Sequence, residues 1–363
     1  MALTDKLTAI ADAIRSKTGS TDPLTLDGMV TAVEGIQAGG SGFPNGMEWT
    51  QAKPYASGST FYQIKMADGL LVAVSNKKVF TSTDGMTWSN GTTTSFQSAS
   101  VAYGSGVLVA ADDYLDAGLW YSTDGTSWTK GLDGAFATVR YANGIFVAVS
   151  YGSSGTGFWY STDGKAWSQS NVTTGGFNNF DNGVDCVDGV WIATNGSLYL
   201  SDDGITWEKA TVSGNGMTKF NRAISFKGVF VAISNLYPQG VYYSTDRGTT
   251  WTKSNVTGNN IRKHALCNHN GVLFCCSGNS GIWSSTDGIT WVNTSSDDLD
   301  YIKSACGIMI AGSSGVQGLW YSTDGISWTQ SNITDETPVG IEHYNGMWFS
   351  GGRYIYYSPS WLP

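Results

Sequence analysis

Short segments of apolar and aromatic residues, separated by polar turn signals, run along most of the chain. Residues 136–169 show the pattern, and their segments are 136–141, 145–150, 157–161 and 165–169. Their length and their content of Val, Ile, Phe, Tyr and Trp are typical of β-strands. Asn143-Gly144, between the first two segments, predicts a tight hairpin turn. The pattern therefore predicts a four-stranded antiparallel unit.

This unit recurs along the chain, with the motif Ser-x-Asp-Gly-x-x-Trp between its third and fourth strands. Seven complete copies of this Asp box are present, one of them lengthened by an arginine, and their aspartates are Asp84, Asp124, Asp163, Asp203, Asp246, Asp287 and Asp324. A period of about 40 residues is that of one β-propeller blade. In each box we expect Asp to accept backbone N–H bonds, Gly to adopt positive φ and Trp to pack between blades.

A turn glycine before each second strand gives the number of units as eight. These glycines are Gly69, Gly104, Gly144, Gly189, Gly228, Gly271, Gly307 and Gly346. The C-terminal unit lacks a fourth strand, whereas Asn45–Thr50 repeats the second half of a box at the other end of the chain. We therefore predict an all-β fold, an eight-bladed β-propeller, with seven blades as the alternative. Residues 45–51 are expected to complete the last blade, which closes the ring and removes open sheet edges.

The first forty residues follow a helical pattern instead. Apolar positions at helical spacing predict a short helical hairpin, broken at Thr18–Pro23. Its apolar face consists of Leu3, Leu7, Ile10, Ile14, Leu26, Met29, Val33 and Ile36. Two helices of this size bury too little surface to fold alone, so they must pack against copies of themselves, the propeller or another protein. The predicted domains are a helical attachment segment (1–37), a Gly-rich linker (38–44) and the propeller (45–363).

Composition and charge exclude several functional classes. The 363-residue chain has a formal net charge of −9 and a pI near 4.7, which opposes binding to nucleic acid. No apolar run approaches the length of a membrane span, and the N-terminus lacks the apolar core of a signal peptide. The five cysteines and three histidines have no metal-ligand spacing. We therefore expect buried free thiols, no metal, no cofactor and no membrane insertion.

Two family resemblances add to this interpretation. The Asp boxes over residues 45–361 resemble the BNR-like repeats of sialidases and other propellers, which implies the fold. The catalytic pattern of sialidases is not carried over, because Gly42–Asn45 stands where that family has an Arg-Ile-Pro stretch. The segment Leu3–Ile36 resembles the helical N-terminal segment of phage and prophage tail proteins from Gram-positive hosts. That resemblance implies a virion tail protein, assembled in the bacterial cytoplasm, that docks by its N-terminus to a tail or baseplate protein as a homo-oligomer.

One position of the first strand carries charged and varied side chains. Four residues before the turn glycines stand Lys65, Ser100, Arg140, Asp185, Ile224, Cys267, Lys303 and Glu342, with a possible register shift at Cys267. The first strand of a blade is the innermost, so its charged residues face water, one another or a ligand in the central channel. The ligand-binding candidates are therefore Lys65, Arg140, Asp185, Lys303 and Glu342. The loops between second and third strands, which vary in length, are the second candidate site.

These features favour three functions. The first is a tail receptor-binding protein whose propeller binds a ligand on the host cell surface, a glycan or a protein. The second is a structural or decoration protein of the virion. The third is a glycoside hydrolase in which Asp185 and Glu342 form an acid/base pair. Nothing in the sequence brings these two carboxylates to the separation that hydrolysis needs, so we expect binding and no catalysis.

Overall fold

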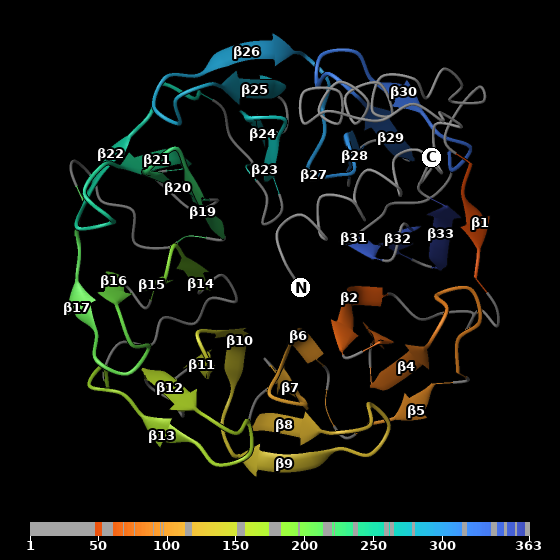
Figure 1. Cartoon of the computed structure of the whole chain (residues 1–363), viewed down its shortest axis with the longest axis vertical. Coiled ribbons are helices and arrows are strands. Elements are labelled where there is room, and N and C mark those ends of the chain that lie inside the picture. Colours follow the sequence, from red (N-terminus) through yellow and green to blue (C-terminus); the bar gives the residue numbers. More distant parts are fainter. Residues whose placement is uncertain are drawn as a thin grey trace, which may run out of the picture.

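The computed structural model contains a ring of eight β-sheets around a central channel (Figure 1). It describes residues 48–52, 61–67, 69–75, 77–89, 91–94, 96, 98–112, 118–150, 157–173, 183–194, 197–212, 220, 222–234, 239–257, 261, 265–277, 280–313, 318–334, 340–344, 347–352 and 354–359. The protein is thus an eight-bladed β-propeller, which confirms the predicted fold. The predicted helical hairpin, with its apolar face from Leu3 to Ile36, and the linker at 38–44 lie outside the described residues.

The blades are numbered here by the order of their first strands, and each is given from the innermost strand outward. Blade 1 contains β2 (Phe61–Ala67), β3 (Leu70–Ser75), β4 (Lys78–Ser82) and β5 (Thr92–Thr93). Blade 2 contains β6 (Ser98–Gly104), β7 (Val107–Asp112), β8 (Gly118–Ser122) and β9 (Thr129–Leu132). Blade 3 contains β10 (Phe136–Ala142), β11 (Ile145–Ser150), β12 (Phe158–Ser161) and β13 (Ser168–Gln169). Blade 4 contains β14 (Val184–Val187), β15 (Val190–Thr194), β16 (Leu198–Ser201) and β17 (Glu208–Lys209).

The second half of the ring repeats this order. Blade 5 contains β19 (Arg222–Phe226), β20 (Val229–Ser234), β21 (Gly240–Ser244) and β22 (Thr250–Lys253), with β18 (Thr211–Val212) parallel to β22. Blade 6 contains β23 (Leu266–His269), β24 (Val272–Cys276), β25 (Ile282–Ser285) and β26 (Val292–Ser295). Blade 7 contains β27 (Tyr301–Ala305), β28 (Ile308–Gly312), β29 (Leu319–Ser322) and β30 (Thr329–Gln330). Blade 8 contains β31 (Gly340–Tyr344), β32 (Met347–Gly351), β33 (Ile355–Pro359) and β1 (Thr50–Gln51).

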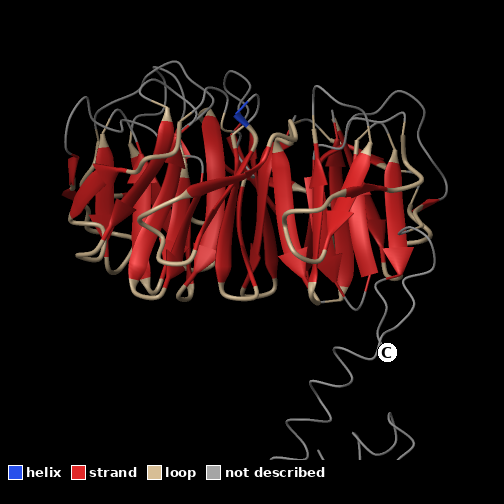
Figure 2. Cartoon of the chain, turned by 90° about the horizontal axis from the view of Figure 1, so that it is seen from above, coloured by secondary structure: helices blue, strands red, loops and turns tan. Residues whose placement is uncertain are grey.

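The core lies between neighbouring blades. Every residue of the second strands β7, β11 and β20 is buried, because both faces of these strands are covered by adjacent sheets. Ala102 and Val109 of blade 2, for example, pack in one cluster with Phe136 and Phe146 of blade 3. Figure 2 shows the result, a low disc in which the strands run along the channel axis. Among the described residues, no helix is long and apolar enough to cross a membrane.

The Asp boxes act as local turn caps that also space the blades. In the first box, Asp84 Oδ1 accepts hydrogen bonds of 2.8 Å from the amides of Met86 and Thr87. Gly85 has a φ of +73°, and a Cβ there would lie 2.1 Å from the ring of Phe349 in blade 8. Glycine is therefore required both by the turn and by the approach of the preceding blade. Trp88 is 3% exposed between blades, and its Nε1 donates to the Gly85 carbonyl.

The two ends of the propeller meet in blade 8. Strand β1 pairs with β33, with Thr50 opposite Tyr357 and Gln51 opposite Tyr356. Asn332 of blade 7 adds a clamp, since its Oδ1 accepts from Trp49 N at 2.8 Å and its Nδ2 donates to Trp49 O at 2.9 Å. The outer strand of the last blade thus comes from the start of the described chain, at the place where the half-box predicts it.

One predicted turn is wrong by two residues. The hairpin between β6 and β7 turns at Ser105-Gly106, both with positive φ, and not at Gly104, the last residue of β6. Gly104 is small for another reason, because a Cβ there would meet the ring of Tyr141 in blade 3. Ala102 pairs with Val109 and therefore takes the inner-strand position that was assigned to Ser100. The suspected shift at Cys267 does not occur, since Cys267 pairs with Phe274 as Lys65 pairs with Val72.

The cysteines are only partly buried. All five are free thiols, as expected. Cys267, Cys275 and Cys276 are buried, but Cys186 is half-buried and Cys306 is exposed. The prediction of buried thiols is therefore wrong for the last two. Their positions explain this, because Cys186 lines the channel and Cys306 forms the hairpin turn before β28.

Candidate functional site in the central channel

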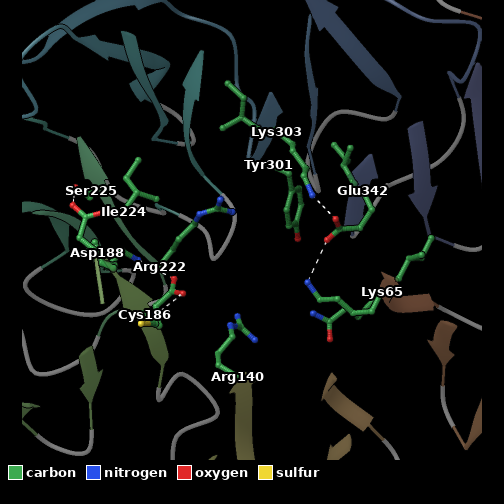
Figure 3. A pocket seen from close by; sticks show the side chains of 17 residues that line it. Lys65, Arg140, Cys186, Asp188, Arg222, Ile224, Ser225, Tyr301, Lys303 and Glu342 are labelled. Carbon is green, nitrogen blue, oxygen red and sulfur yellow. Dashed lines mark hydrogen bonds and ion pairs between the residues drawn. The ribbon is translucent and has the colours of Figure 1, made fainter. Parts of the chain in front are cut away.

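The inner strands of six blades surround a cavity of about 520 Å³ (Figure 3). All five candidates named from the sequence line it, and they are Lys65, Arg140, Asp185, Lys303 and Glu342. Each is half-buried. They come together because every inner strand presents alternate residues to the channel, while the residues between them pack into the blade. A cavity of this volume lies within the usual range of small-molecule sites, about 300–1,000 Å³.

The other residues named at this strand position have different surroundings. Ile224 also lines the cavity. Cys267 is buried in the core cluster shared by blades 5, 6 and 7. Ser100 is buried beside Arg140, whose Nη1 lies 3.3 Å from the serine hydroxyl. Of these three residues, Ile224 lines the cavity, whereas Cys267 and Ser100 do not.

Sequence reasoning missed a further cation, Arg222. It lies on β19, two residues before Ile224, and lines the cavity. Residues two apart on a strand face the same side of the sheet. Blade 5 therefore carries its charged channel residue at the inward position before the one that is charged in blades 1, 3, 4, 7 and 8. A search over both inward positions of each strand would have found it. Asp188, in the turn after β14, also lines the cavity and accepts a hydrogen bond from Ser225.

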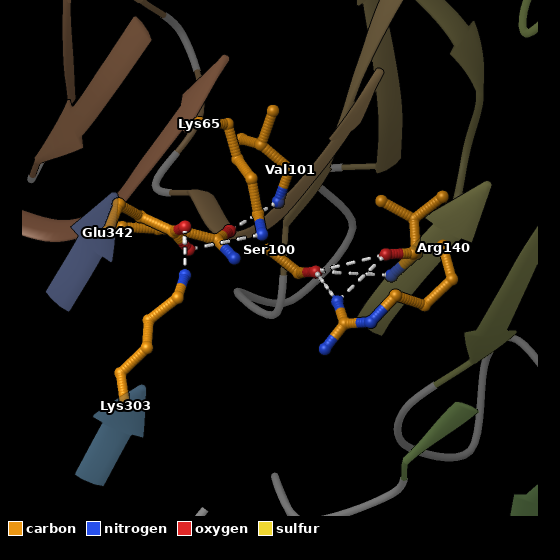
Figure 4. Close-up of polar contacts among 8 residues, drawn as sticks. Lys65, Ser100, Val101, Arg140, Lys303 and Glu342 are labelled. Carbon is orange, nitrogen blue, oxygen red and sulfur yellow. Dashed lines mark hydrogen bonds and ion pairs between the residues drawn. The ribbon is translucent and has the colours of Figure 1, made fainter. Parts of the chain in front are cut away.

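Glu342 bridges two lysines across the first, seventh and eighth blades (Figure 4). Its Oε1 lies 3.5 Å from Lys65 Nζ, and its Oε2 accepts a hydrogen bond from Lys303 Nζ. Burial alone raises the pKa of Glu342, but the positive charges of Lys65 and Lys303 outweigh it, so this pKa lies below its ordinary value. Glu342 is therefore ionised at neutral pH.

Lys65 is in a less favourable environment. Burial lowers its pKa, the charge of Glu342 raises it, and the charges of Arg140 and Lys303 lower it again. The net result is a pKa below the ordinary value for lysine. Burial is thus the first cause of this shift, and the ion pair with Glu342 offsets only part of it.

The remaining charged groups are held by neutral partners. Arg140 Nη1 donates to Val139 O at 3.2 Å and to Ser100 Oγ at 3.3 Å (Figure 4). Asp185 accepts backbone hydrogen bonds from Cys186, at 3.1 Å, and from Ala223 of blade 5, at 3.4 Å. Within the described part of the chain, neither Arg140 nor Arg222 forms an ion pair with a carboxylate.

The two carboxylates considered for catalysis lie on opposite sides of the ring. Asp185 is on β14 in blade 4 and Glu342 is on β31 in blade 8, four blades away (Figure 1). Glycoside hydrolases place their two carboxyl groups about 5–10 Å apart around one bond. Here the whole channel separates the two elements, and Glu342 already bridges two lysines. Among the described residues, no group of three or more His, Cys, Asp or Glu is placed to hold a metal ion.

Comparison with known proteins identifies the fold class and no family. No family model matches the chain, and no curated protein matches it. Among solved structures, the computationally designed Ika8 protein aligns with a TM-score of 0.64 at 10% identity, over 86% of this chain and 100% of that one. BamB from Moraxella catarrhalis aligns with a TM-score of 0.59 at 9% identity, over 85% and 99%.

YCF48 bound to D1 peptide gives a third match, with a TM-score of 0.53 at 14% identity, over 87% of this chain and 96% of that one. At these identities the similarity extends to the fold alone. The fold and the channel together define a class: an eight-bladed β-propeller with a polar, charged central cavity.

Proposed function

We propose that this protein is a receptor-binding protein of a phage or prophage tail, whose propeller binds a glycan on the host cell surface. The observation that carries the proposal is the channel cavity with its charged wall. The turns, boxes and second strands repeat from blade to blade, whereas the residues of the first strands that face the channel differ between blades. Residues that differ between copies of a constant framework are the ones available to recognise a ligand.

The helical segment supports the other half of the proposal. The resemblance of Leu3–Ile36 to tail-protein segments suggests attachment to a tail or baseplate protein, as a homo-oligomer, after synthesis in the host cytoplasm. Several propellers on one particle would contact the cell together, so a weak affinity per channel would suffice. A protein of this fold is already seen with a peptide in the YCF48 structure, which supports binding as a use of the fold.

Binding fits the channel better than hydrolysis does. Asp185 and Glu342 are four blades apart, and the lysines that flank Glu342 keep it ionised, whereas a general acid must carry a proton. The cavity offers several hydrogen-bonding groups, both cationic and anionic, to a bound ligand.

The experiment is imaging of the purified particle by cryo-electron microscopy, combined with binding of the labelled full chain to host cell envelopes. We expect the chain at the tail tip, its N-terminal segment inside the assembly, and saturable binding to envelopes. A chain found on the capsid with no envelope binding would instead support a decoration role. Release of sugar from envelopes, lost in Asp185→Asn and Glu342→Gln variants, would overturn the proposal in favour of a hydrolase.

A further inference from the structure

The charge of the channel is opposite in sign to that of the whole protein. The chain has a net charge of −9, yet cations outnumber carboxylates on the cavity wall. The cations are Lys65, Arg140, Arg222 and Lys303, and the carboxylates are Asp185, Asp188 and Glu342. All four cations lie on odd-numbered blades, 1, 3, 5 and 7, so they are distributed around the channel. An acidic protein that gathers cations at one half-buried place provides a local site for negative charge.

The carboxylates do not neutralise these cations evenly. Glu342 pairs with both lysines, and Asp185 and Asp188 accept hydrogen bonds from backbone amides and from Ser225. Arg140 and Arg222 therefore have no carboxylate partner among the described residues. Burial is the first cause of the lowered pKa of Lys65; the charge of Glu342 opposes it, and the charges of Arg140 and Lys303 add to it.

The two arginines flank one blade. Arg140 comes from β10 in blade 3 and Arg222 from β19 in blade 5, on either side of β14 in blade 4, and both side chains extend into the channel (Figure 3). Arg140 is oriented by neutral acceptors, Val139 O and Ser100 Oγ, which leave its charge uncompensated. A guanidinium group presents several N–H donors in a planar fork that matches the oxygens of a carboxylate or a phosphate.

We infer that the channel binds a sugar that carries an anionic group, a carboxylate or a phosphate, and that Arg140 and Arg222 bind this group. The side-chain oxygens of Asp185 and Glu342 then accept hydrogen bonds from the sugar hydroxyls. This inference rests on the proposed binding function, because it names the ligand class for the same cavity. It does not depend on the tail location.

The test is isothermal titration calorimetry of the full chain with three soluble probes. These are an oligogalacturonate for the carboxylate, an oligomer of glycerol phosphate for the phosphate, and maltotriose as the neutral control. We expect at least one acidic probe to bind about tenfold or more tightly than maltotriose, and its affinity to fall as salt rises. The acidic probe that binds identifies the source of the anion.

Substitutions test whether Arg140 and Arg222 bind the anionic group. Arg140→Met and Arg222→Met should each weaken the acidic probe about tenfold, and Arg140→Lys should weaken it less, because it keeps the charge and loses the fork. Lys209→Met is the matched control, since it removes one cation from the exposed strand β17 and should change nothing. Unchanged melting temperatures establish that the variants are folded, and a variant that melts early is replaced by the Arg→Lys change at the same position.

Three results would overturn the inference. They are equal affinity for the acidic and neutral probes, an affinity for the acidic probe that does not change with salt concentration, and an unchanged affinity for that probe in both Arg→Met variants. The results also distinguish failure of this inference from failure of the proposed receptor-binding function. If the chain binds host envelopes but neither acidic probe, the proposed function stands and the anionic ligand is wrong. If an acidic probe binds in the channel but envelopes do not bind, the ligand class stands and the receptor-binding role is wrong.

Discussion

The boxed aspartates show how a repeated single residue stabilises each turn. Six of the seven are exposed and Asp84 is half-buried, and each carboxylate accepts amide hydrogen bonds from residues two to four positions later, as Asp163 does from Lys165 and Ala166. The Ala166 and Lys165 amides hold the pKa of Asp163 below its ordinary value, because they stabilise the ionised form. The same direction of shift occurs at all seven boxes.

These shifts predict that the propeller loses stability in acid. The folded-state pKa values lie below the unfolded value of about 3.9, so the stabilisation is present above that pH and is lost as the pH falls through the folded values. We expect the melting temperature, followed by circular dichroism, to change little between pH 7 and 5 and to drop steeply below pH 4. Asp163→Asn should make this drop shallower, whereas Asp202→Asn, at a box position that does not cap the turn, should not. A melting temperature that stays level down to pH 3 would contradict the prediction.

At the scale of the strands, a second motif joins neighbouring blades. Ser-Asn-(Val or Ile)-Thr occurs after the boxes of blades 3, 5 and 7, at 170–173, 254–257 and 331–334. Its asparagine makes two hydrogen bonds to the backbone of the box tryptophan in the next blade, and the pairs are Asn171 with Trp207, Asn255 with Trp291 and Asn332 with Trp49. The next residue, Val172, Val256 or Ile333, is buried. These sequences look like glycosylation sites, but each amide is already bonded to the next blade.

The clamp predicts a measurable contribution to stability. Asn255→Ala removes the bonds at 2.8 and 2.9 Å to Trp291 and should lower the free energy of unfolding by about 1–2 kcal/mol. Thr257→Ala is the control, because it destroys the same sequon, is exposed and leaves the clamp intact. Urea unfolding followed by tryptophan fluorescence measures both. Equal stability of the two variants would show that the clamp contributes nothing.

For the whole molecule, the closure of the ring is the decisive contact. Trp49, which is 4% exposed, packs with Ile310 and Trp348 and links the start of the described chain to blades 7 and 8. Without strand β1 the edge of β33 would be open, and without Trp49 the Asn332 clamp would have no partner. The pairing of β1 with β33 is the seam at which the ring closes, and the stability of the propeller depends on the strand that closes it.

Truncation tests this closure. A variant lacking residues 1–51 removes β1 and Trp49, and its melting temperature should fall by at least about 5 °C, since loss of a buried tryptophan costs roughly 3–5 kcal/mol. A variant lacking residues 1–40 keeps the seam and should melt as the full chain does. Scanning calorimetry compares the three proteins. Identical melting of both truncated variants would mean that β1 does not stabilise the ring.

Sequence alone predicted the elements better than the register of the site. The turn before β7 was misplaced because Gly104 and Gly106 both precede an apolar strand, and only the pairing of Ala102 with Val109 decides between them. Arg222 was missed because blade 5 carries its charge at the other inward position. Both errors concern which residue of a correctly predicted strand faces the channel, and that depends on contacts with neighbouring strands and blades.

The sequence by itself determined the strands, the boxes and the number of blades. Each of these is a local motif, in which hydrogen bonds such as those of Asp84 join residues two or three positions apart. Only the tertiary structure decided which charges meet. Lys65 and Glu342 are 277 residues apart in the chain and face each other because ring closure puts blade 1 beside blade 8. The pairing of Glu342 with two lysines, and the arginines left without a carboxylate, follow from that closure.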